Sequence, residues 1–299
     1  MVFVRFGITA LDWSTVMSQL FSKGTLDFSQ FDFAEIMRIT HNQGFSLMEL
    51  TVDIGYVLPG ALSENQIESL LSVKEELDLA YTAHLPLWSI EPSSPNAFIR
   101  EASVDCLVEA IQLVKPLDPE VYVMHNVGWL GAEFGEFDIT PQYKPYLFEV
   151  LGGLAEQSVK ELLQRTDLPP QKIALESIQF PFEYTWRIAE RLDTTICLDT
   201  GHVLSGQSGS TDLLDFVDRY HSRLSEIHLH DGAERPVDGR RFSYFDHQVL
   251  GKGDMPVVEF LTALEKCGFD GPVIFELNRE EALESLKEIR KLLPGFPIE

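Results

Sequence analysis

Ile196-Cys197-Leu198-Asp199-Thr200-Gly201-His202 is the stretch from which the fold and the chemistry of this chain can be interpreted. Its apolar start predicts a short buried strand, and Asp199 stands where that strand would end. Gly201 permits a turn, and His202 follows the acid by three residues. Both side chains can therefore face one point just beyond the strand, where a carboxylate and an imidazole together suit a divalent metal. The stretch gains weight because other predicted strands also end in His or Glu.

Eight short apolar segments alternate with helical patterns along the chain, and no linker or shift of composition divides them. Buried strands that alternate with helices predict a parallel sheet covered on its outer face, and eight such units close a barrel. We therefore expect an α/β protein, a single (β/α)8 TIM-barrel domain over residues 1–299. The predicted strands are 3–8, 47–52, 79–85, 121–125, 172–176, 195–199, 224–230 and 273–277. The predicted helices are 31–42, 63–77 (opened by a capping box of Ser63 and Gln66), 101–114, 146–163, 184–191, 213–220, 255–266 and 280–292.

Side chains that can bind metal stand at the carboxyl ends of six consecutive predicted strands, and active sites of such barrels lie at that end. Any one of them alone is more simply a hydrogen-bonded structural residue. Six in succession are hard to explain by packing, because a buried charge is costly unless it is paired or coordinated. The sequence therefore predicts a metal site built from His84, His125, Glu176, Asp199, His228 and Glu276.

The composition restricts the partners of the protein. The formal charge is −24 and the isoelectric point is near 4.6, and the chain has no run of Lys or Arg. Nucleic-acid binding normally needs a basic face, so we expect a small-molecule substrate and no nucleic-acid partner. The three cysteines are far apart and show no CxxC spacing, which argues against disulfides and thiolate zinc.

The first residues resemble a strand more than a signal peptide, and no apolar run approaches the length of a membrane span. We expect a cytoplasmic protein that does not contact a membrane. The segment 126–145, expected to be a long loop, is rich in aromatic residues, among them Trp129. Loops of that length are often lids or binding walls, although these rings could equally pack on the barrel rim.

Several motifs together resemble the xylose isomerase-like barrels, a superfamily that includes apurinic endonuclease family 2 and many sugar isomerases and epimerases. The resemblance spans essentially the whole chain and is specific for the superfamily more than for one reaction. The motifs are His84-Leu85-Pro86, Met124-His125-Asn126, Ala174-Leu175-Glu176-Ser177, Leu198-Asp199-Thr200-Gly201-His202, Ile227-His228-Leu229-His230-Asp231, Asp246-His247-Gln248-Val249-Leu250-Gly251-Lys252-Gly253 and Gly271-Pro272-Val273-Ile274-Phe275-Glu276-Leu277.

The resemblance implies a cofactor of one to three divalent ions, which could be Zn, Mn, Mg or Co. In the isomerase branch one ion would be held by Glu176, Asp199, His228 and Glu276. In the endonuclease branch Glu176 would also bridge to a second ion held by His84 and His125. A third would be held by His202 with the later acid and imidazole, which here are Asp246 and His247. The sequence departs from the family at this point, because Asp246 is adjacent to the histidine and not two residues before it.

An adjacent Asp-His pair, together with the His-Leu-Pro-Leu and Leu-Asp-x-Gly-His pieces, also resembles the cobamide-remodelling phosphodiesterases. The first functional hypothesis is therefore metal-dependent hydrolysis of a small or corrinoid-like phosphodiester. Two or three ions would polarise the phosphoryl group, activate a water and stabilise the leaving oxygen. The histidines of the third and fourth strands favour this hypothesis, because additional ions need additional ligands.

The second hypothesis is isomerisation or epimerisation of a sugar or sugar phosphate at one metal ion. Glu176 and Glu276 would move a proton across an enediolate, and His202 would orient the substrate. A non-catalytic binding barrel is a third hypothesis, disfavoured because every expected ligand is present. A homodimer is an expectation from analogy alone.

Further residues are expected around the substrate. The predicted substrate-binding residues are Trp88, Trp129, Arg241 and Lys252. A phosphate could be bound by Arg235, Arg240, Arg241 and Lys252, at least two of which are more simply charges of a solvated loop. His41 and His221 fall on helices and are expected to have no chemical role, and His230 is expected to point outward, away from His228.

Overall fold

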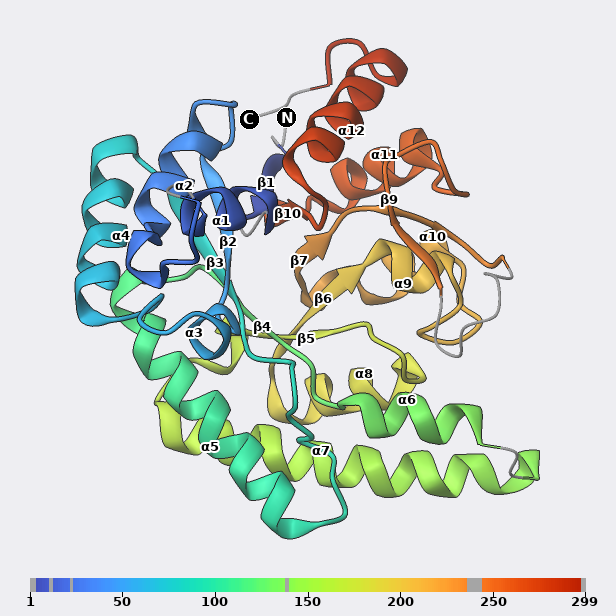
Figure 1. The fold of residues 1–299 in the computed structure, drawn as a ribbon. Coiled ribbons are helices and arrows are strands. Elements are labelled where there is room, and N and C mark those ends of the chain that lie inside the picture. The colour runs from blue at the N-terminus through green and yellow to red at the C-terminus, as the bar shows by residue number, and fades with distance from the viewer. Residues whose placement is uncertain (1–3, 11–12, 22–23, 138–139, 236–243, 297–299) are drawn as a thin grey trace.

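Eight parallel strands form a closed barrel in the computed structural model, which describes residues 4–10, 13–21, 24–137, 140–235 and 244–296. The barrel closes where β1 pairs with both β2 and β10. This architecture confirms the predicted TIM barrel (Figure 1). In their order around the barrel the strands are β1 (Arg5–Thr9), β10 (Pro272–Phe275), β7 (Leu224–His228), β6 (Thr195–Asp199), β5 (Ile173–Glu176), β4 (Tyr122–Met124), β3 (Ala80–His84) and β2 (Leu47–Thr51).

The strands are buried on both faces, which explains why they are apolar runs and not alternating patterns. Successive side chains still alternate between the barrel interior and the helices. On the side of β4, β5 and β6, the barrel interior holds a small apolar cluster of Val121, Val123, Ala174 and Cys197. Elsewhere the interior holds polar side chains, and Thr82 donates to Glu226 over 2.9 Å.

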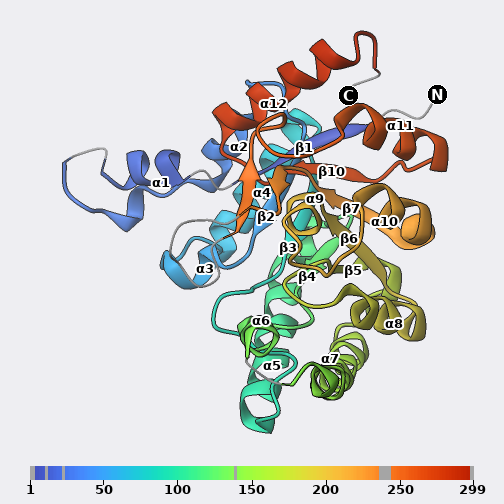
Figure 2. The same ribbon diagram turned by 90° about the vertical axis from the view of Figure 1, so that its right-hand side faces the viewer.

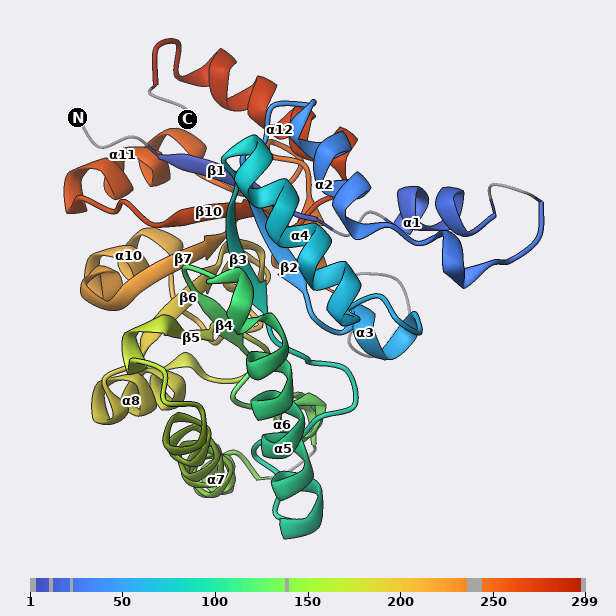
Figure 3. The same cartoon turned by 90° about the vertical axis from the view of Figure 1, so that its left-hand side faces the viewer.

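Helices cover the outside of the barrel (Figures 1 and 3). They are α2 (Phe33–His41), α4 (Glu64–Leu77), α5 (Ala97–Val114), α7 (Lys144–Thr166), α8 (Phe182–Leu192), α10 (Leu213–Tyr220), α11 (Val257–Cys267) and α12 (Arg279–Leu292). The capping box expected at Ser63 was wrong, because Ser63 makes no side-chain cap bond. Gln66 instead bonds the backbone of Phe31 and Phe33, tying α4 to the start of α2.

Three loops contain more structure than the sequence predicted. The aromatic segment after β4 includes a helix, α6 (Trp129–Glu136). The segment after β7 forms a two-stranded antiparallel ribbon of β8 (Asp231–Ala233) and β9 (Phe245–Gln248). Between β6 and α10 lies the short helix α9 (Thr200–Leu204). All three insertions follow the carboxyl ends of strands, the end at which the predicted ligands lie.

Two further helices lie near the start of the chain. The helix α1 (Trp13–Leu20) extends away from the barrel (Figures 2 and 3), and the helix α3 (Ile54–Val57) follows β2. Trp13 of α1 stacks on Trp88, with ring centroids 6.4 Å apart. Within the described part of the chain, none of the helices has the length and apolar character needed to cross a membrane.

Candidate metal centre

Four side chains converge at the carboxyl ends of β5, β6, β7 and β10. Glu176, Asp199, His228 and Glu276 each offer one ligand atom, and these atoms lie within 4.8 Å of one another. Nδ1 of His228 is 3.5 Å from Oε1 of Glu176 and 3.4 Å from Oε1 of Glu276. The same Nδ1 is buried and has no hydrogen-bond partner among the described residues. An imidazole nitrogen without a hydrogen-bond partner, beside carboxylate oxygens, is a position that a divalent cation can fill.

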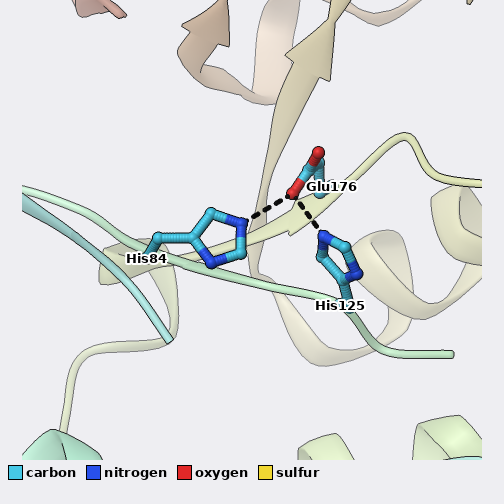
Figure 4. Close-up of side chains that lie close together, drawn as sticks. All are labelled: His84, His125 and Glu176. Atoms are coloured by element: carbon cyan, nitrogen blue, oxygen red, sulfur yellow. Dashed lines mark hydrogen bonds and ion pairs between the residues drawn. The ribbon is translucent and has the colours of Figure 1, made fainter. Parts of the chain in front are cut away.

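A second group shares Glu176 with the first. Nε2 of His84 and Nε2 of His125 lie 3.2 and 2.9 Å from Oε2 of Glu176 (Figure 4). The carboxylate thus directs one oxygen to His228 and the other to this pair of histidines. Glu176 lies at the end of β5, between the two groups. Its carboxylate could therefore bridge two cations. Alternatively, one oxygen could bind a single cation while the other accepts hydrogen bonds from His84 and His125.

The outer nitrogens of two of these histidines are held by acceptors. His84 Nδ1 is 2.8 Å from the carbonyl of Leu85, which can only accept, so Nδ1 carries a proton and Nε2 faces the cluster. His228 Nε2 is 3.2 Å from Oε2 of Glu49, which leaves Nδ1 toward the cluster. Ligating histidines in proteins are oriented in this manner by carbonyl or carboxylate acceptors.

The electrostatics of the cluster show what the cation would replace. Burial opposes ionisation of Glu176, but the charges of His125 and His228 hold its pKa well below the ordinary range. Burial likewise opposes protonation of His84, but its hydrogen bond to Glu176 and the charge of Glu49 raise the pKa of His84 to about 10. Protons on His84 and His228 would therefore balance the carboxylates, and a bound cation would take the place of those protons.

His202, Asp246 and His247 also lie beside the cluster, and His202 Nδ1 is 3.6 Å from Oε1 of Glu176. His202 Nδ1 is 3.0 Å from the carbonyl of Ser177, and its Nε2 is 3.9 Å from Oδ2 of Asp246. Gln207 donates to the same oxygen over 2.6 Å. Burial disfavours the charge of Asp246, but hydrogen bonding and the charge of His247 hold its pKa below the ordinary range.

His247 belongs to a further group with His230 and Glu276. Its Nε2 is 3.5 Å from Oε2 of Glu276. Burial opposes its protonation, but hydrogen bonds to Asp246 and Glu276 raise the pKa of His247 to about 11. The later Asp-His pair is thus brought to the cluster, with the histidine paired to Glu276 and the acid turned toward His202 and Gln207.

The expectation that His230 points outward was wrong. Residues two apart in extended backbone point to the same face, and His230, two residues beyond the end of β7, lies beside Glu276 as His228 does. His230 is fully buried, and its Nε2 is 2.9 Å from Oδ2 of Asp199. His41, at the end of α2, and the exposed His221 do not line the cavity.

A cavity of about 410 Å³ opens above the cluster, within the size range of small-molecule sites. Its lining includes the histidines and glutamates of the cluster together with a set of apolar and aromatic residues. The apolar and aromatic lining residues are Leu87, Val127, Trp129, Ala132, Ile178 and Tyr244.

Of the predicted substrate-binding residues that the structure describes, one lines this cavity and the others do not. Trp129 lines it, whereas Trp88 is adjacent to the lining residue Leu87 and stacks on Trp13. Lys252 is exposed and lies 3.6 Å from Glu284, away from the lining. Arg240 and Arg241 lie outside the described residues, and Arg235 pairs with Asp254.

Comparison with known proteins identifies the family to which this barrel belongs. Residues 37–293 match the sequence pattern of the xylose isomerase-like TIM barrel family. The chain belongs to that family. A relative of Methanocaldococcus jannaschii, an uncharacterized protein, is 25% identical over 242 residues, which are 77% of this chain and 75% of the relative.

Solved structures of the family share the fold. A D-tagatose 3-epimerase-like protein is 20% identical with a TM-score of 0.68 and covers 98% of both chains. D-psicose 3-epimerase from Clostridium cellulolyticum H10 is 15% identical with a TM-score of 0.64, covering 90% of this chain and 95% of its own. The 3-keto-D-glucoside 4-epimerase YcjR of E. coli is 14% identical with a TM-score of 0.64, covering 96% and 99%.

The sequence prediction missed three polar residues that lie near the candidate ligands. Glu49 on β2 and Glu226 on β7 are fully buried, and Gln207 bonds Asp246 from the loop after α9. A signal for the two glutamates was present, because each is a charged residue within an apolar strand. Glu226 is also two residues before His228 and therefore shares its face. For Gln207 the sequence offers no comparable signal.

Proposed function

We propose that this protein is a divalent-metal-dependent enzyme that isomerises or epimerises a sugar or sugar phosphate, with Glu176 and Glu276 as its acid–base pair. The observation that carries the proposal is the placement of the two glutamates. They stand at the carboxyl ends of β5 and β10, which are separated in the barrel by β6 and β7 with Asp199 and His228. A substrate above the cluster would therefore meet one glutamate on each side.

Each glutamate divides its two oxygens between different partners. One oxygen of each lies beside Nδ1 of His228, at 3.5 Å for Glu176 and 3.4 Å for Glu276. The other oxygen of Glu176 contacts His84 and His125, and the other oxygen of Glu276 lies 3.5 Å from His247. His84 and His125 can thus stabilise the carboxylate of Glu176, and His247 that of Glu276, while each glutamate accepts or returns a proton.

A cation bound by the four converging residues would polarise neighbouring carbonyl and hydroxyl oxygens of the substrate and so acidify the carbon-bound proton. One glutamate would remove that proton, and the other would return a proton from the opposite side. His202 lines the cavity, and because its Nδ1 faces the carbonyl of Ser177, its Nε2 can accept a hydrogen bond from a substrate hydroxyl. Trp129 and Leu87 can cover the apolar face of a sugar ring. The three similar structures described above are two sugar epimerases and one epimerase-like protein, which supports a carbohydrate substrate.

Replacement of the two glutamates tests this assignment. Glu176→Gln and Glu276→Gln should each lower kcat by about 10²–10⁴-fold, because proton transfer by a positioned carboxylate contributes that much. Wild-type protein loaded with Mn²⁺ or Co²⁺ should exchange a carbon-bound proton of a ketose with deuterated solvent, measured by NMR over a panel of ketoses and ketose phosphates. The exposed Glu259→Gln on α11 is the matched control and should retain full activity. Activity that survives both active-site changes would contradict the acid–base assignment.

Phosphodiester hydrolysis is a second candidate, and one observation favours it. One metal-capable group beyond the four-residue cluster is formed by His84, His125 and Glu176. A one-ion isomerase needs no such additional groups, whereas a hydrolase of two or three ions does.

His84→Ala separates the two candidates. It should abolish a multi-ion hydrolase but only weaken a one-ion isomerase. Metal analysis of the purified protein should find one ion per chain for the isomerase and two or three for the hydrolase. Turnover of a cobamide or of a simple phosphodiester, with none of the sugars, would overturn the proposed function.

A further inference from the structure

His230 occupies a position between a proposed ligand and a loop of the active site. Its ring is fully buried. Nε2 is 2.9 Å from Oδ2 of Asp199, and Nδ1 accepts the backbone N–H of His247 over 2.9 Å. The rings of His230 and His247 also stack, with centroids 4.2 Å apart and planes 15° from parallel. One imidazole thus connects β6 with β9.

These contacts define the tautomer of His230. A backbone N–H can only donate, so Nδ1 must be free of a proton to accept it. The neutral ring then carries its proton on Nε2, which points to the carboxylate of Asp199. With both nitrogens engaged in this way, His230 has no lone pair for a cation. It therefore differs from His228, whose Nδ1 is unpartnered among the described residues.

The strand-end stretch 199–202 forms a cradle for this ring. Thr200 Oγ1 accepts from the backbone N–H of His230 and donates to its carbonyl, over 3.1 and 2.7 Å. A Cβ on Gly201 would overlap the ring of His230. Oδ1 of Asp199 accepts the N–H of His202, while its other oxygen faces His230. The two oxygens of Asp199 are therefore oriented by His202 N–H and by His230, which are not among the four converging residues.

The segment that His230 holds on its other side is strained. His247 has a φ of 50°, in the left-handed region that residues other than glycine rarely adopt. The adjacent Asp246 lines the cavity and faces His202. The hydrogen bond from His247 N–H to His230 offsets the cost of this backbone conformation and keeps Asp246 and His247 beside the cluster.

We propose that His230 is a positioning residue that orients the ligand Asp199 through Nε2–H and holds the Asp246–His247 segment through Nδ1. It thereby couples the metal cluster to the β8–β9 ribbon. The inference rests on the cation ligands of the proposed function but not on the reaction, because it predicts metal affinity and tautomer, which are measured without substrate.

Two variants separate the two bonds. His230→Gln places an amide donor near the position of Nε2 and keeps the bond to Asp199, whereas His230→Asn places an amide oxygen near Nδ1 and keeps the bond to His247. We expect His230→Asn to weaken Mn²⁺ and Co²⁺ binding by about 10–100-fold, as for other partners of metal ligands. We expect His230→Gln to remain within about threefold of wild type in affinity while hydrogen exchange of residues 245–248 accelerates. The exposed His221→Asn is the control and should change neither measurement.

The imidazole ¹⁵N spectrum of the metal-free protein provides a measurement independent of cation binding. The His230 signals, assigned by their loss in either variant, should be those of the Nε2–H tautomer. An Nδ1–H tautomer would overturn the proposal, as would equal loss of affinity in both variants or unchanged affinity in both. Loss of one imidazole ligand from the Co²⁺ absorption spectrum in His230→Gln would identify His230 as a ligand and also overturn it. Absence of catalysis with these binding results intact would contradict only the proposed function.

Discussion

Gly201 lies where no side chain fits, because the imidazole of His230 occupies the space that a Cβ would need. Gly201→Ala should destabilise the protein by about 1–3 kcal/mol, the usual cost of overpacking a filled interior. It should also weaken cation binding, since His230 contacts Asp199. Urea unfolding and calorimetric titration with Mn²⁺ measure the two effects.

Gly153, exposed on α7, provides the matched control, because nothing lies within 4 Å of a Cβ built there. Gly153→Ala should stabilise the helix by about 0.5–1 kcal/mol and leave the cation affinity unchanged. An equal response of the two glycine variants would show that the space beside His230 is not restricted.

The protonation of His228 predicts how cation binding depends on pH. Burial opposes its charge, but Cys197, Glu276 and Glu49 raise the pKa of His228 well above its ordinary value of 6.5. A proton bound near neutral pH must leave before Nδ1 can bind a cation. Affinity should therefore rise as pH increases above 6.5, with a proton released per ion. Calorimetry in buffers of different ionisation enthalpy measures that release.

The same shift predicts the opposite trend for the metal-free protein. A folded-state pKa above the unfolded value contributes stability that is complete below pH 6.5 and is lost as the pH rises through the folded value. Cation affinity that is constant between pH 6.5 and 8.5 would contradict a protonated His228 in the metal-free site.

For some residues a place in the candidate site could be predicted from the sequence, and for others it could not. His84, His125 and Glu276 could be predicted because each follows an apolar run at a strand end. Glu49 lies in mid-strand, where its purpose depends on His228, which is 179 residues away in the chain. No local pattern reports such a pairing. The misjudged side of His230, by contrast, was an error in applying the strand period and not a limit of the sequence.

At the scale of elements, the capping box of α12 lies next to the candidate metal ligand Glu276. Asn278 accepts from Glu281 N–H, and the Glu281 side chain accepts from Asn278 N–H, only two residues after Glu276. Asn278→Ala should cost about 1 kcal/mol of stability. It should also weaken cation binding, because the cap fixes the backbone that follows Glu276.

Asp32→Ala is the matched control for that change. Asp32 caps α2 through the N–H of Glu35 and belongs to none of the metal-capable groups. We expect a similar loss of stability with unchanged cation affinity. If both variants bind the cation as wild type does, the α12 cap has no influence on Glu276.

Strands and outer helices could be predicted because apolar periodicity is a local property of the chain. The α6 helix and the β8–β9 ribbon were missed because their stability depends on contacts from elsewhere. Asp231, for example, is buried and accepts from the backbone N–H groups of Gly251 and Met255. Those bonds shape the loop that carries His247, and they join residues about 20 apart in sequence.

At the scale of the whole molecule, closure of the barrel brings together side chains that the sequence separates by nearly two hundred residues, from His84 to Glu276. The convergence was predictable once eight strand–helix units had been recognised, because the carboxyl ends of parallel strands share one rim. The grouping within that rim was not predictable. Which oxygen of Glu176 faces which histidine depends on side-chain geometry that only the folded chain defines.

Anomalous diffraction from crystals loaded with Mn²⁺ or Co²⁺ tests the metal centre most directly. The account predicts a peak coordinated by Glu176, Asp199, His228 and Glu276 at about 2.0–2.2 Å, with His230 hydrogen-bonded to Asp199 outside the coordination sphere. A peak held by other residues, or no peak at saturating cation, would contradict it.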